Sequence, residues 1–223
     1  MKLYRDLETI FNLSSNISFI VLGAGGTGSF VVDTINQLSM SMPNIKYCFV
    51  ADGDIIEHKN ISRQRFIEQD IGKNKATVVC SRYSFNKTVK FIPYPYFVKK
   101  LPLDDRDKTF ASFTTTIIDN IGISNIDPND MTYIILDCVD NVNARKDIFE
   151  FYNSCVVDKN YIKSFYPIDD TLITNILDMA MKALSNNCFR DYVQAKVLFI
   201  DMGTDFRTGQ IHICIDDFLI SSI

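Results

Sequence analysis

The sequence predicts an α/β fold with a doubly wound, mostly parallel sheet and helices on both faces. Apolar strand patterns alternate with helix patterns along the chain, which is the order of βαβ units. The central strand patterns are continuous apolar runs, as expected for strands that are buried on both faces. The first strand pattern, 17–22, leads directly into a glycine loop and then a helix pattern. These three features together favour a Rossmann-like architecture.

The individual elements follow from the spacing of apolar residues and from breaker residues. Strands are expected over 17–22, 47–51, 89–92, 133–136, 197–200 and 211–215. Helices are expected over 3–13, from the glycine loop to about 41, and over 71–85, 142–155 and 170–186. The segment 93–129 contains several prolines and the charged cluster DDRDK, so it is expected to be mostly loop with one short strand or helix. We expect one domain over 1–223, with an inserted helical segment at about 157–194.

Composition limits the classes of function. The chain has 223 residues, is 47% hydrophobic and carries a net charge of −4, so it can fill a large core and lacks the basic excess of a nucleic-acid binder. It contains no apolar run of the ~18 residues that a membrane span needs, and its first residues do not resemble a signal peptide. A soluble cytoplasmic protein is predicted. The six cysteines form no C-x-x-C pair, which argues against a zinc ribbon, and several fall in apolar patterns typical of buried thiols.

The glycine loop is the strongest single motif. It follows a strand and precedes a helix, which is the context that gives a G-x-G-x-x-G match its meaning. Glycine lets the backbone turn tightly and approach a phosphate, and the helix N-terminus offers free N–H groups to the anion. A turn without a ligand is the less favoured alternative. The candidate phosphate-binding residues are Gly23, Gly25, Gly26 and Gly28.

Two acidic residues follow the second strand. Asp52 lies 24 residues after Gly28, at the position where a carboxylate accepts hydrogen bonds from ribose hydroxyls, and Asp54 completes a D-x-D strand end. This feature alone does not separate NAD from ATP.

A polar and cationic set lies just beyond this strand end, and it favours a triphosphate because Arg and Lys hold the extra charge. For any single Lys or Arg, ordinary solvated surface charge is the commoner explanation. The set consists of Asn60, Arg63, Gln64 and Lys75.

A further acidic position, Asp140, follows the strand over 133–136. A carboxylate at a strand end beside a triphosphate is a natural Mg²⁺ ligand. The alternative is that Asp140 caps the helix that follows. Both roles are compatible if Asp137 or Asn141 shares the capping.

Five motifs occur in this order along the chain, and together they resemble a known family: VLGAGGTGS, ADGD, NISRQ, DIGKNKA and LDCVDNVNAR. The sequence resembles the ThiF and MoeB adenylyltransferases, which are the bacterial form of the ubiquitin-activating superfamily. The later IDMGTDFRTGQIHI is similar to the closing strand pair of that family, so the resemblance covers about 17–215. The chain looks like a minimal member of the kind encoded by plasmids or phages.

The resemblance implies a ThiF-like adenylation domain that uses ATP and Mg²⁺. Such a protein joins adenylate to the C-terminal glycine of a ubiquitin-like or sulfur-carrier protein and works as a homodimer. It implies that the four glycines line the phosphates, that Asp52 binds ribose and that Asp140 binds Mg²⁺. It assigns the triphosphate to Asn60, Arg63, Gln64 and Lys75, with Arg63, Lys75 and Asp140 as the catalytic group.

The sequence also departs from the family. The cysteine loop that follows the closing strands in members with a thioester or persulfide step is expected to be absent, and so are the zinc-binding C-x-x-C pairs. Cys188 is the one cysteine to consider for a thiol role, and Arg5 is a possible counterpart of the arginine that the family takes from a partner. Two alternatives therefore remain open. Beside the adenylyltransferase, these are a nucleotide-binding scaffold or partner subunit without catalysis and, less favoured, an NAD-dependent oxidoreductase.

Overall fold

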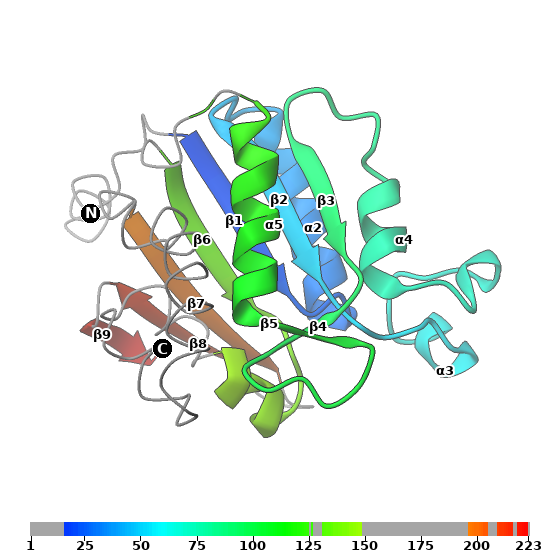
Figure 1. The fold of residues 1–223 in the computed structure, drawn as a ribbon. Helices are drawn as coiled ribbons and strands as arrows, with labels where there is room; N and C mark the ends of the chain where they lie inside the picture. Colours follow the sequence, from blue (N-terminus) through cyan, green and yellow to red (C-terminus); the bar gives the residue numbers. More distant parts are fainter. Residues whose placement is uncertain are drawn as a thin grey trace, which may run out of the picture.

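A computed structural model describes residues 16–124, 126, 131–148, 196–204, 209–215 and 218–222. Its main feature is a seven-stranded sheet with the order β3-β2-β1-β6-β7-β8-β9 (Figure 1). The five strands from β3 to β7 pair in parallel, and β8 and β9 continue the sheet antiparallel to their neighbours. The predicted mostly parallel sheet is therefore confirmed.

The strands lie where apolar runs predicted them, with one addition. Their bounds are β1 Asn16–Leu22, β2 Ile45–Ala51, β3 Lys90–Tyr94, β6 Met131–Asp137, β7 Lys196–Thr204, β8 Gly209–Ile215 and β9 Phe218–Ser222. The strand β9 was not predicted, since it follows β8 after a short connection that gave no separate apolar pattern. The sequence order β1, β2, β3 runs toward one edge and β6 resumes beside β1, so the direction of winding reverses between β1 and β6.

Helices cover both faces of the sheet, as a doubly wound fold requires. Helix α2, Gly26–Ser39, and helix α4, Lys75–Ser81, pack on one face. Helix α5, Phe110–Gly122, packs on the other, and Figure 1 shows it crossing the sheet with α2 behind.

Alternate residues of each strand supply the two cores, because successive side chains point to opposite faces. In β1, Val21 belongs to the core under α2 and α4, whereas Ile20 and Leu22 belong to the core under α5. All three are at most 1% exposed. Burying such a side chain contributes about 1.5–3 kcal/mol, so these two layers fix the sheet between its helices.

The segment after β3 corrects the sequence prediction. Instead of mostly loop, it holds a small two-stranded sheet, β4 Phe97–Lys99 and β5 Asp107–Thr109, followed by the 13-residue helix α5. The hydroxyl of Thr109 accepts a hydrogen bond from the N–H of Ser112 and caps α5. The Thr/Ile-rich run has weak helix propensity, and burial of Phe113 and Ile117 against the sheet overrides that preference.

Several other expectations have defined outcomes. Helix α4 is shorter than the predicted 71–85, because a 3₁₀ turn, η1 Glu68–Asp70, and Gly72 at φ +82° precede it. The predicted helix over 142–155 is present over 142–148. Cys48, Cys80 and Cys138 are buried thiols, as expected. The predicted helices over 3–13 and 170–186, the inserted segment 157–194, Arg5 and Cys188 lie outside the described residues.

Within the described residues, no helix is both long and apolar enough to cross a membrane.

Candidate nucleotide-binding site

The glycine loop connects β1 to α2 and is built on close backbone approaches. Gly23 has φ +95°, a left-handed conformation that glycine adopts without strain. A Cβ on Gly28 would lie 1.8 Å from the carbonyl oxygen of Gly23, so the first turn of α2 sits directly against the loop. At Gly25 the nearest atom to an added Cβ is Gln64 Nε2 at 3.6 Å, and at Gly26 it is the carbonyl oxygen of Arg63 at 3.6 Å. The loop is closed on its inner side and faces residues 63–64 on its outer side.

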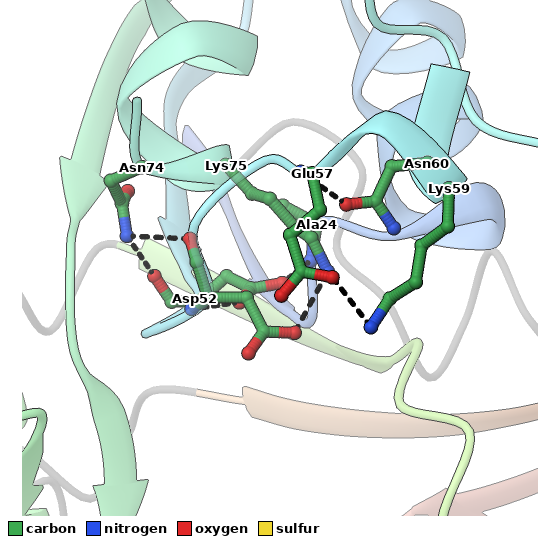
Figure 2. Close-up of polar contacts among 8 residues, drawn as sticks. Ala24, Asp52, Glu57, Lys59, Asn60, Asn74 and Lys75 are labelled. Carbon is green, nitrogen blue, oxygen red and sulfur yellow. Dashed lines mark hydrogen bonds and ion pairs between the residues drawn. The ribbon is translucent and has the colours of Figure 1, made fainter. Parts of the chain in front are cut away.

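Asp52 ties the end of β2 to this loop. Its Oδ2 accepts a hydrogen bond of 2.7 Å from the N–H of Ala24, and its Oδ1 accepts one of 2.8 Å from the N–H of Asp54 (Figure 2). Burial of Asp52 raises the pKa of the carboxyl group above its usual value, although these two backbone hydrogen bonds and the charge of Lys75 act in the opposite direction. Each oxygen keeps one lone pair after these bonds, so the group can still accept hydroxyl donors.

Lys75 begins α4 and is 7% exposed. Its Nζ donates a hydrogen bond of 2.7 Å to Oδ2 of Asp54, which is the third residue of the D-x-D strand end. Asn74 secures the same junction. Its side-chain nitrogen donates to the carbonyl oxygens of Asp52 at 2.7 Å and Asp54 at 3.2 Å, and its oxygen caps α4 through the N–H of Thr77 (Figure 2). The D-x-D strand end and the start of α4 are therefore one polar unit.

Gln64 lines the cavity, but two other members of the predicted phosphate-binding set do not. Asn60 is 4% exposed, and its Oδ1 accepts a hydrogen bond of 2.8 Å from the N–H of Glu57, so it caps the short helix α3, His58–Ile61. Arg63 is exposed, and its Nε lies 3.4 Å from the carbonyl oxygen of Lys59. Oε1 of Gln64 is buried and has no hydrogen-bond partner among the described residues.

Asp140 follows β6 and is exposed on the wall of the cavity. The helix after it is capped by Asn141, whose Oδ1 accepts a hydrogen bond of 2.8 Å from the N–H of Ala144. Arg145 donates to the carbonyl oxygen of Val139 at 2.8 Å and fixes the loop between strand and helix. Asn141, and not Asp140, therefore caps this helix, and the Asp140 carboxylate is left available to a ligand. The Mg²⁺ role of Asp140 stays a prediction.

These side chains meet in one cavity of about 280 Å³ at the carboxyl ends of β1, β2 and β6. The sequence-predicted residues on its wall are Gly23, Gly25, Gly26, Asp52, Asp54, Gln64, Lys75 and Asp140. Gly28 does not line the cavity. It lies in the first turn of α2, where the absence of a Cβ allows the carbonyl group of Gly23 to approach the helix closely.

One wall of the cavity was missed by sequence reasoning. Phe97, Val98 and Lys99 of β4 line it, facing a helix that contributes Ile148. Lys99 donates a hydrogen bond of 2.6 Å to Asp147 of that helix and joins the two sides. Sequence reasoning missed this wall because β4 has only three residues and forms by pairing with β5, so no apolar strand pattern predicts it.

The fold and this cavity place the protein in the doubly wound α/β class. It has a glycine loop at a helix N-terminus and a carboxylate at the end of the adjacent strand, which is the arrangement with which such folds bind nucleotides. A comparison of the sequence with models of protein families matches the ThiF family over residues 10–163, which is more than half of the chain. The protein belongs to the ThiF family, as its motifs predicted. Among curated proteins, none matches the sequence significantly.

Solved structures with a similar fold include two E. coli proteins. The tRNA N6-threonylcarbamoyladenosine dehydratase TcdA is 17% identical, with 69% of this chain and 53% of that chain covered and a TM-score of 0.42. Its complex with ATP is 19% identical, with coverages of 63% and 47% and a TM-score of 0.37. MccB with MccA is 17% identical, with coverages of 92% and 42% and a TM-score of 0.41. The chain thus spans about half the length of these proteins or less, and the family assignment depends on the family model alone.

Proposed function

We propose that this chain is an ATP-dependent adenylyltransferase that activates the C-terminal carboxylate of a ubiquitin-like or sulfur-carrier protein. Members of the ThiF family are ATP-dependent adenylating enzymes. The observation that carries the proposal is a cavity that combines a glycine loop, the buried cation of Lys75 and the Asp140 carboxylate, which pairs with none of the described residues. An NAD-binding site accounts for the loop and for Asp52, but it gives no task to Lys75 or Asp140.

The phosphate end of the site is the glycine loop with Lys75 and Gln64. The loop presents backbone N–H groups at the N-terminus of α2, where the helix dipole favours an anion. The Lys75 ammonium uses one of its three N–H donors on Asp54, so two remain for phosphate oxygens. Asp54 therefore fixes the position of the Lys75 ammonium group and leaves it able to donate further hydrogen bonds. Gln64 adds an amide on the opposite side of the loop.

The nucleoside end is supported by Asp52 and by the apolar wall. Asp52 keeps one free lone pair on each oxygen for the ribose hydroxyls, while its bonds to the N–H groups of Ala24 and Asp54 fix its orientation. Phe97, Val98 and Ile148 provide apolar surface in the same cavity. A flat purine base matches such a surface, since cofactor pockets are mostly apolar with a few placed polar groups.

The donor set fits one Mg²⁺ ion bound together with the nucleotide. Asp140 offers a carboxylate on the cavity wall that neither caps the following helix nor pairs with any described residue. Mg²⁺ is usually held by one or two carboxylates and by phosphate oxygens, so one carboxylate is sufficient here. Within the described residues, no group of three or more acidic, His or Cys side chains competes as a metal site. When bound, the ion would neutralise charge on the phosphates.

The proposed reaction is an in-line displacement at the α-phosphorus of ATP. A bond forms between the carrier carboxylate oxygen and the α-phosphorus, and the bond from that phosphorus to the bridging oxygen breaks. Pyrophosphate leaves with the bonding electron pair, and the carrier retains an acyl-adenylate. The chain would contribute position and charge, since Lys75 and the glycine loop line the cavity in which the phosphates would lie, and no protein nucleophile is required.

The test is calorimetric titration of the protein with ATP and with NAD, each with and without Mg²⁺. We expect ATP binding that depends on Mg²⁺ and little binding of NAD. Lys75→Met should weaken ATP binding, whereas the exposed neighbour Lys73→Met, which is outside the cavity lining, should not. Asp140→Asn should remove the Mg²⁺ dependence, with the exposed Asp105→Asn as its control. NAD binding that ignores Mg²⁺ would favour the oxidoreductase, and binding of neither nucleotide would favour a scaffold.

The carrier protein and a homodimer are also part of this proposal, and both come from the resemblance to the ThiF and MoeB enzymes. Sedimentation of the purified protein tests the dimer. Pyrophosphate exchange into ATP in the presence of candidate carriers with a C-terminal glycine tests the substrate.

A further inference from the structure

The outer wall of the glycine loop is a segment without regular secondary structure. Helix α3 ends at Ile61, and the chain then passes Gly25 and Gly26 with the side chain of Gln64 and the carbonyl oxygen of Arg63 at 3.6 Å from their added Cβ positions. The position of segment 62–66 therefore determines how closely Gln64 and the carbonyl oxygen of Arg63 lie to the glycine loop. Since it is neither a helix nor a strand, its position depends on contacts made by its own side chains and by its neighbours.

The beginning of this segment is fixed by hydrogen bonds to α3. The N–H groups of Arg63 and Gln64 donate to the carbonyl oxygen of Asn60 at 3.2 Å and 2.8 Å. These bonds fix the beginning of the segment and leave its end to be placed by other contacts.

The end of the segment is held by Arg65, which is not among the motif residues. Its guanidinium forms an ion pair with Oδ2 of Asp33, two turns along α2 from the glycine loop, and lies 4.8 Å above the ring of Phe30. The second oxygen of Asp33 accepts a hydrogen bond of 2.9 Å from the hydroxyl of Tyr83, just beyond α4. The carbonyl oxygen of Arg65 accepts from Arg82, which is also beyond α4. One residue thus connects the segment to both helices that flank the loop.

The electrostatics agree with this geometry. Burial raises the pKa of Asp33, but hydrogen bonds from Arg65 and Tyr83 and the charge of Arg65 outweigh it and place the pKa below its usual value. The Asp33 carboxyl is therefore ionised at neutral pH and pairs with a charged guanidinium.

We infer that Asp33 and Arg65 are positioning residues for the nucleotide site, because their ion pair holds segment 62–66, and with it Gln64, against the glycine loop. This inference rests on the proposed function and deepens it. Neither residue lines the cavity, so neither is expected to touch the nucleotide. Their side chains are 23% and 48% exposed, and pairs with this exposure contribute little to global stability. The effect should therefore appear in ligand affinity and local order more than in the melting temperature.

The test uses Arg65→Met, Asp33→Asn and the double variant, with ATP titrated by calorimetry in Mg²⁺. Each single variant should weaken ATP binding about fivefold, which corresponds to the upper value of such an ion pair, and the double variant should be no worse than either single one. Lys59→Met is the matched control, because Lys59 of α3 forms an exposed ion pair with Glu57, the residue just before this helix, and connects no other element. The control should bind ATP as the wild type does. Hydrogen exchange of the amides of 62–66 should be faster in the three test variants without nucleotide.

Three results would overturn the inference. Weakened ATP binding in Arg65→Met but not in Asp33→Asn would mean that Arg65 acts on the nucleotide directly. Unchanged binding and unchanged exchange in both variants, with a wild type that binds ATP, would mean that the segment is held by its other contacts, and the proposed function would stand. A wild type that binds no ATP would remove the proposed function and this inference together, whatever the exchange data show.

Discussion

Substitution of Gly28 by alanine is the most direct test of how the glycine loop is built. The added Cβ would lie 1.8 Å from the carbonyl oxygen of Gly23 and 2.8 Å from its carbonyl carbon. Both contacts are with backbone, so no side chain can rotate away to relieve them. Gly23 is itself held, because its N–H donates to the carbonyl oxygen of Ala51 at 2.8 Å. Either the loop or the first turn of α2 must move by more than 1 Å, as an order-of-magnitude estimate for restoring ordinary contact distances.

The loss in the free energy of unfolding caused by Gly28→Ala can be estimated. Overpacking a well-filled core typically costs about 1–3 kcal/mol, and a clash between two backbone segments belongs at the upper end of that range. For a protein of 223 residues, about 3 kcal/mol lowers the melting temperature by roughly 6–12 °C. Calorimetric or fluorescence-detected thermal unfolding of Gly28→Ala against the wild type measures this shift.

Gly25→Ala is the matched control, since the same methyl group is added three residues away. Its nearest neighbour would be Gln64 Nε2 at 3.6 Å, which is ordinary contact, so the melting temperature should change little. The methyl group would enter the cavity, and ATP affinity should fall. A Gly28→Ala protein that is as stable as Gly25→Ala would refute the argument that the loop is closed by backbone contact.

The remaining predictions concern the charged groups of the cavity. Lys75→Met should weaken ATP binding about tenfold or more in calorimetry, because it removes a charged donor, and Asp54→Asn should weaken it less. Lys99→Met should lower the free energy of urea unfolding by about 1 kcal/mol or less, since its pair with Asp147 is partly exposed, but should also reduce ATP affinity by freeing β4 from the facing helix. Burial raises the pKa of the Asp52 carboxyl group above 3.8, so the folded state binds the carboxyl proton more tightly than the unfolded state does. Ionisation of Asp52 therefore opposes folding. The stability of Asp52→Asn relative to wild type should therefore improve as pH rises from about 3.5 to about 7, and a change in the opposite direction would contradict the assigned burial.

Motif spacing predicted most of the candidate site, because parallel strands bring their carboxyl ends to one edge of the sheet. The glycine loop, Asp52 and Asp140 each follow a strand, so their meeting needed only the sheet order. The same reasoning put Asn60 and Arg63 with them, whereas in the structure Asn60 caps α3 and neither residue is part of the cavity lining. A spacing along the chain shows which residues are near the site, but not the direction of each side chain in a loop.

The sequence alone determined the elements whose patterns are local: the apolar strands, the glycine loop with the helix after it, and hence the sheet edge where we propose that a nucleotide binds. The tertiary structure decided the rest. It placed Phe97 and Lys99 on the cavity wall, since β4 forms only by pairing with β5, and it turned a Thr/Ile-rich run into α5, since burial against the sheet outweighed its propensity. It also joined Arg65 to Asp33 across 32 positions. Such contacts between distant residues have no periodic signal along the chain, because they depend on where the packed elements bring them.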